Sequence, residues 1–69
     1  MNLDEAREVA YDWHGGMWSP LYSFASTGKV HGTDHRINLL REIDDIRQWA
    51  GSSAEAERIQ ALAAFVAVA

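Results

Sequence analysis

The strongest helical pattern in the chain lies in the stretch DHRINLLREIDDIRQWA, residues 34–50. Its apolar residues recur at the spacing of one face of an α-helix: Leu39, Ile43, Ile46 and Ala50. Gly51 follows directly and favours the end of a helix at this point. We therefore predict a long amphipathic helix over these residues. The rest of the chain is expected to pack against its apolar stripe.

Two shorter helices are predicted before this one. The pair Gly15-Gly16 is expected to end a first helix by supplying the left-handed backbone conformation that other residues resist. Ser19-Pro20 has the order of N-cap and proline that begins a helix, and Gly28 ends this second helix after about eight residues. A helix of this length is not stable alone, so we expect contacts from Trp18 and Phe24 to hold it.

A fourth helix is predicted from Ser52 to the C-terminus, because Ser52 and Glu55 form a capping box. All residues from 61 to 69 are apolar, and a helix that is apolar on every side is either buried or meets a partner. Full burial of a terminal helix is difficult in a small domain. We therefore predict a homo-oligomer, with this interface: Leu62, Phe65 and Val66. The alternative is one side in the core of the monomer and a frayed end.

Length and composition predict a single all-α domain over residues 1–69, built from four helices with a short second helix. The chain has no cysteine, which excludes disulfides and a thiolate zinc site. No apolar run approaches the roughly 20 residues that span a bilayer, and the acidic N-terminus lacks the order of a signal peptide. We expect a cytoplasmic protein without a membrane partner.

The net charge of −4 is unevenly distributed. Residues 13–41 carry Lys29, Arg36 and Arg41 against Asp34, whereas both terminal segments are acidic. This positive charge is too small for binding to nucleic acid, which we do not expect as a partner. A small anion is a better match to the mildly basic middle of the chain.

The candidate site lies between Tyr11 and His35, a stretch with five of the seven aromatic residues, all three histidines and four of the five glycines. Trp13 and Phe24 fall on apolar helical faces and are expected in the core. The residues that remain are predicted to bind a ligand: His14, Gly15, Gly16, Trp18, Tyr22, Lys29, His31 and Arg36. Aromatic rings stack on a base or fill a partner's pockets, while backbone N–H groups at glycine turns and helix starts hold a phosphate or carboxylate.

Catalytic and metal chemistry find little support in the same stretch. No nucleophile elbow, Walker loop or GxGxxG motif is present. His31 and His35 have a spacing that suits metal ligands, but Gly32 interrupts the helix between them and no clear third ligand supports a site. We expect no enzyme activity, no metal and no cofactor.

The segment HGGMWSPLYSFASTG, residues 14–28, resembles short uncharacterised proteins of actinobacterial phages and mobile elements. The resemblance covers about a fifth of the chain, and it implies a small accessory protein in the host cytoplasm that blocks a host enzyme or sequesters a host signal. The leading expectation is therefore an inhibitor of a host defence system that sequesters a small anionic, nucleotide-like signal. The alternatives are occlusion of a host protein and a structural or assembly oligomer.

Overall fold

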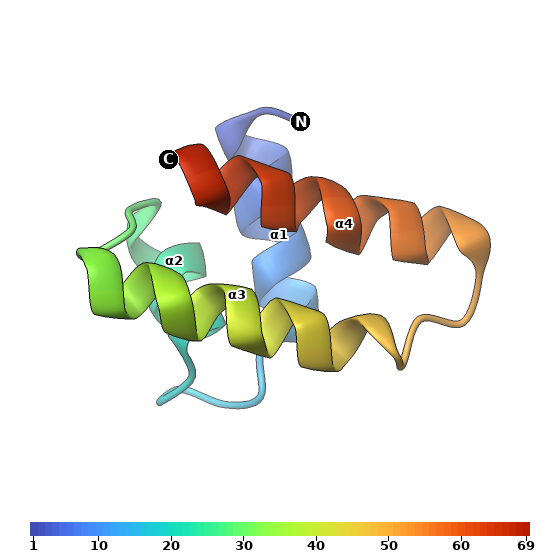
Figure 1. Ribbon diagram of the computed structural model, residues 1–69, viewed down its shortest axis with the longest axis horizontal. Helices are drawn as coiled ribbons and strands as arrows, with labels where there is room; N and C mark the ends of the chain where they lie inside the picture. The colour runs from blue at the N-terminus through green and yellow to red at the C-terminus, as the bar shows by residue number, and fades with distance from the viewer.

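The computed structural model describes residues 1–69 and contains four α-helices joined by short links (Figure 1). The helices are α1 (Leu3–Trp13), α2 (Pro20–Thr27), α3 (Thr33–Arg47) and α4 (Ser53–Val68). This architecture confirms the prediction of an all-α domain with four helices and a short second helix. No helix is long and apolar enough to cross a membrane.

The helices form two packed pairs. α3 and α4 lie side by side and antiparallel, while α1 passes behind them at a steep angle (Figure 1). α2 packs mainly against α1 and also contacts α3. The N-terminus of α2 lies next to α3, since Glu42 of α3 accepts a hydrogen bond from Leu21 N, and this position matters for the candidate site.

All four helices contribute to one core. The buried apolar residues are Ala6, Val9, Ala10, Leu21, Phe24, Ala25, Leu39, Ile43, Ile59, Leu62 and Val66. Phe24 is among the largest fully buried side chains, and its ring meets the edge of Phe65 at a centroid distance of 6.4 Å. The predicted role of Phe24 as an anchor of α2 is confirmed. Leu39 and Ile43 of the α3 stripe are buried, as their spacing predicts.

The interface predicted on α4 requires a correction. Leu62 and Val66 are fully buried in the core of the chain itself, so they cannot contact a second copy. Phe65 is half-buried, and its ring packs against that of Phe24 within the same chain. The reason is that α4 packs against α1 as well as α3, which covers a wider face than one neighbouring helix would. Homo-oligomer formation itself stays a prediction.

The end of α1 differs from the prediction. His14 follows the helix in an extended conformation, and Gly16 rather than Gly15 has a positive φ, of 147°. The glycine pair was expected to end the helix by a left-handed conformation, but His14 ends it in an extended conformation and the chain turns later, at Gly16. α3 also ends earlier than predicted, at Arg47, and its N-cap is Gly32 without a side-chain cap.

The ends of α2 and α4 follow the predictions more closely. Ser19 Oγ accepts a hydrogen bond from Tyr22 N, and Gly28 ends α2 in the left-handed conformation at φ 72°. Ser52 Oγ accepts from Glu55 N at 3.1 Å, which confirms the predicted cap of α4. The Glu55 carboxylate in turn accepts from Gly51 N at 2.8 Å.

Arg7 of α1 holds the C-terminal end of α2. Its Nε donates to Ala25 O at 2.8 Å and its Nη2 donates to Ser26 O at 3.1 Å. A cation at this end also interacts favourably with the helix dipole. Trp18 was expected to hold the helix, but its side chain is exposed, so this part of the prediction is wrong. Arg7 and the buried Phe24 hold α2 instead.

Arg7→Ala is expected to lower the free energy of unfolding by about 2 kcal/mol, because it removes two hydrogen bonds from a charged donor to backbone carbonyls. Urea denaturation followed by circular dichroism measures this loss. Arg41→Ala is the matched control, since Arg41 is exposed and makes no hydrogen bond. Equal denaturation midpoints for the two variants would contradict the role of Arg7.

Candidate binding surface at the α1–α2 loop

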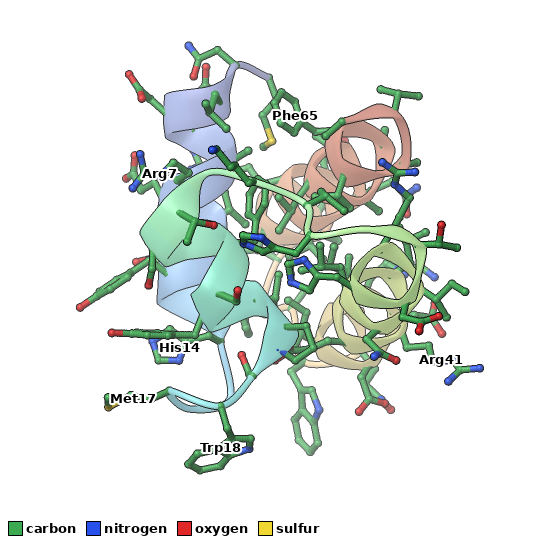
Figure 2. All side chains as sticks on the ribbon, turned by 90° about the vertical axis from the view of Figure 1, so that its left-hand side faces the viewer. Arg7, His14, Met17, Trp18, Arg41 and Phe65 are labelled. Carbon is green, nitrogen blue, oxygen red and sulfur yellow. The ribbon has the colours of Figure 1, made fainter.

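The α1–α2 loop, residues 14–19, carries two large apolar side chains into solvent. Trp18 is 85% exposed and Met17 is 75% exposed. Figure 2 shows both side chains at the outer end of the loop, directed away from the helices. Single exposed apolar residues are common on proteins, but two adjacent ones of this size at a protruding tip form an apolar contact surface. We call Met17 and Trp18 the apolar tip.

Hydrogen bonds within the loop define its shape. Gly16 N donates to His14 Nδ1 at 3.1 Å, and Ser19 N donates to Gly16 O at 3.0 Å. The ring of Trp18 lies over Gly16 so closely that a Cβ atom on Gly16 would be 2.7 Å from the ring. Position 16 therefore requires glycine for two reasons: its φ of 147° is unfavourable for other residues, and a side chain there would collide with the ring of Trp18.

Glu42 of α3 connects the loop to the rest of the domain. Its Oε1 accepts from Leu21 N at 2.9 Å, and its Oε2 accepts from Gly15 N at 3.3 Å. The carboxylate is half-buried and has no cationic partner, since the one ion pair of the chain joins Arg47 and Asp44. Both oxygens of Glu42 are thus used on backbone N–H groups on the two sides of the apolar tip.

These contacts alter the role predicted for the glycine turn. The N–H groups of Gly15 and Gly16, which were expected to hold an anion, already donate to Glu42 and His14. At the start of α2, the N–H groups of Leu21 and Tyr22 donate to Glu42 and Ser19. A phosphate at this turn would have to displace a carboxylate and an N-cap, so the anion-holding role of Gly15 and Gly16 is not supported.

Arg36 was also predicted to bind the ligand, but it serves the other end of the domain. Its Nε donates to Val66 O at 3.2 Å, and its Nη2 donates to Ala69 O. A cation at the last carbonyls of a helix satisfies unpaired acceptors and complements the dipole. The structure therefore assigns Arg36 to the C-terminus of α4 and separates it from the loop.

The α2–α3 link forms a second group of predicted residues. His31 N donates to His35 Nδ1 at 2.8 Å, and the two rings lie 5.1 Å apart. His31 Nε2 lies 2.9 Å from Thr27 Oγ1, while Lys29 is exposed. This link and the α1–α2 loop lie at opposite ends of α2, roughly 12 Å apart for a helix of this length. Lys29 and His31 contact Thr27 at the end of α2, whereas His35 Nε2 lies 3.1 Å from Pro20 O at its start. The predicted site residues therefore do not form one compact group.

An aromatic cluster joins the α1–α2 loop to α1 and α2 through Tyr11, His14 and Tyr22. The His14 ring lies 5.0 Å from the ring of Tyr22 and 5.5 Å from that of Tyr11, measured between centroids. The two tyrosine rings are 6.5 Å apart. This arrangement brings together two predicted site residues, His14 and Tyr22, beside the loop that carries Trp18.

Three exposed side chains were missing from the predicted site: Tyr11, Met17 and Trp49. Each is a large apolar or aromatic residue that is not part of an apolar helical stripe, and this is the signal in the sequence that could have identified them. Tyr11 extends the aromatic cluster and Met17 belongs to the apolar tip. Trp49 lies in the α3–α4 link and is 73% exposed.

The segment that carries the apolar tip, from Trp13 through Gly28, has no charged Asp, Glu, Lys or Arg side chain, although the chain as a whole has a net charge of −4. The apolar tip and the aromatic cluster together therefore offer apolar contact, ring faces and hydroxyl groups. The nearest carboxylate that bonds to the loop is Glu42, which adds negative charge.

Comparisons with known proteins give no relative for this chain. No protein-family model matches it, and neither curated proteins nor solved structures give a match.

Proposed function

We propose that this chain is a non-catalytic binding protein that inserts its apolar tip into an apolar pocket of a partner protein. The observation that carries the proposal is Trp18, which is 85% exposed at the end of a loop that internal hydrogen bonds hold in shape. Tryptophan is enriched among the residues that dominate binding energy at protein interfaces, and methionine is enriched in interface cores. The aromatic cluster of Tyr11, His14 and Tyr22 supplies the border of the contact.

A protein partner fits this surface better than a nucleotide does. The N–H groups of the glycine turn and of the α2 start are engaged within the chain, and Glu42 would repel a phosphate there. An apolar pocket, in contrast, needs no charged group opposite the loop. Burial of Trp18 and Met17 in such a pocket removes them from water, which makes the free energy of binding more favourable. Residues 14–28 resemble short uncharacterised proteins of actinobacterial phages and mobile elements, and a host protein as the partner would make the chain an inhibitor by occlusion.

Salt dependence tests this proposal. Immobilised chain is used to capture partners from lysate of cells that carry its gene, and each candidate is purified and titrated by calorimetry. An increase in ionic strength from about 0.1 M to about 1 M shortens the Debye length from about 10 Å to about 3 Å. We expect the affinity to change by less than about threefold, because apolar burial rather than charge drives the contact.

The nucleotide alternative is examined by the same method. The chain is titrated with mononucleotides, dinucleotides and cyclic nucleotides at both ionic strengths. Heat from a nucleotide at low salt that disappears at high salt would replace our proposal with sequestration of an anionic signal. A purified protein partner whose binding collapses at high salt would likewise contradict an apolar contact.

A further inference from the structure

We infer that Glu42 is the positioning residue of the apolar tip, which it holds in one orientation before a partner binds. This inference rests on the proposed function, because order in the free loop increases affinity only if the loop binds a partner. Glu42 lies outside the loop, on α3, and makes no contact with the partner in this proposal.

The geometry of Glu42 is that of a bridge. Its two carboxylate oxygens bond to Leu21 N and Gly15 N, which lie on the two sides of residues 16–20. These residues include both side chains of the apolar tip. The carboxylate thereby closes the loop into a ring and joins this ring to α3.

The other contacts of the loop act at different places. The bond from Gly16 N to His14 Nδ1 and the bond from Ser19 N to Gly16 O are both internal to the loop and fix its local shape. The start of α2 is also held by the buried Ser19 and by His35 of α3, whose Nε2 lies 3.1 Å from Pro20 O. Within residues 14–19, Gly15 alone is bonded to a side chain of another helix, and that side chain is Glu42.

A carboxylate suits this position for two physical reasons. It offers two acceptor oxygens and no donor, so it satisfies two N–H groups that a glutamine could satisfy only in part. Its negative charge at the N-terminus of α2 also complements the dipole of that helix. The absence of a cationic partner leaves both oxygens free for the backbone, whereas an ion pair would compete for them.

Order in the free chain should increase affinity. A loop that is mobile before binding loses conformational entropy when it docks, and each side chain that becomes immobilised weakens the complex. With the loop fixed by Glu42, this entropy is already lost on folding. The proposal therefore assigns to Glu42 an effect on loop order that is measurable without any partner.

The test is nitrogen-15 relaxation of the free chain, with order parameters compared for wild type, Glu42→Ala, Glu42→Gln and Ser52→Ala. In the wild type, Met17 and Trp18 are expected at about 0.85, the value of rigid backbone, and in Glu42→Ala below about 0.6. Glu42→Gln is expected to keep one of the two bonds and to give intermediate values. Ser52→Ala is the matched control, since it removes the cap of α4 and leaves the loop untouched.

The possible results separate clearly. Order parameters at Met17 and Trp18 that stay near the wild-type value in Glu42→Ala would overturn the inference, as would a wild-type loop that is already mobile or an equal loss of order in Ser52→Ala. If Glu42→Ala does not fold, Glu42→Gln decides the question by the same measurement. None of these results depends on binding, so failure of the inference and failure of the proposed function are distinguishable.

Discussion

Phe24→Ala is expected to unfold a large fraction of the molecules at room temperature. Truncation of a fully buried phenylalanine costs about 3–5 kcal/mol. A domain of this size has a total stability of only about 3–10 kcal/mol, at roughly 0.05–0.15 kcal/mol per residue. Phe24 is fully buried and lies on the eight-residue α2, which cannot stay helical without tertiary contacts. Circular dichroism at 222 nm during thermal and urea denaturation measures the effect.

Two variants serve as controls for this prediction. Phe24→Leu keeps an apolar group of comparable volume and should cost less than about 1.5 kcal/mol. Ile37→Ala changes an exposed apolar side chain and should leave the stability within about 0.5 kcal/mol of wild type. A denaturation midpoint for Phe24→Ala equal to that of Ile37→Ala would show that the core does not depend on this ring.

The helices and most of the core could be predicted from the sequence because both follow from local spacing. The stripe that contains Leu39 and Ile43 is buried, and the caps at Ser19 and Ser52 are formed. These features depend on residues three or four positions apart. The end of α1 was less predictable, since either glycine of a pair can take the positive φ, and Gly16 is the one that does.

The candidate site could be predicted only in part, because its chemistry depends on contacts between distant residues. The sequence shows that Gly15 has an N–H group, but not that Glu42, 27 residues later, already accepts its hydrogen bond. Arg36 likewise bonds to Val66, 30 residues away. Spacing along the chain cannot show which polar groups are already satisfied. Trp18 stays in the proposed surface because it is exposed, and the half-buried Tyr22 stays because its ring packs against that of His14.

Trp18→Ala is expected to weaken partner binding strongly and to leave the fold intact. Loss of a tryptophan that anchors an interface costs at least about 2 kcal/mol of binding free energy, which corresponds to roughly a thirtyfold weaker complex. In the free chain the ring is 85% exposed, so its removal should change the free energy of unfolding by less than about 0.5 kcal/mol. Calorimetry against the purified partner and urea denaturation of the free chain measure the two quantities separately.

Trp49→Ala is the matched control, because Trp49 is another exposed tryptophan but lies in the α3–α4 link. If binding depends on the apolar tip, this variant should retain an affinity within about threefold of wild type. An equal loss in both variants would indicate that any exposed tryptophan attracts the partner, and the contact would then not be specific to the loop. Unchanged affinity in Trp18→Ala would show that the apolar tip is not part of the interface, whether or not the loop is ordered in the free chain.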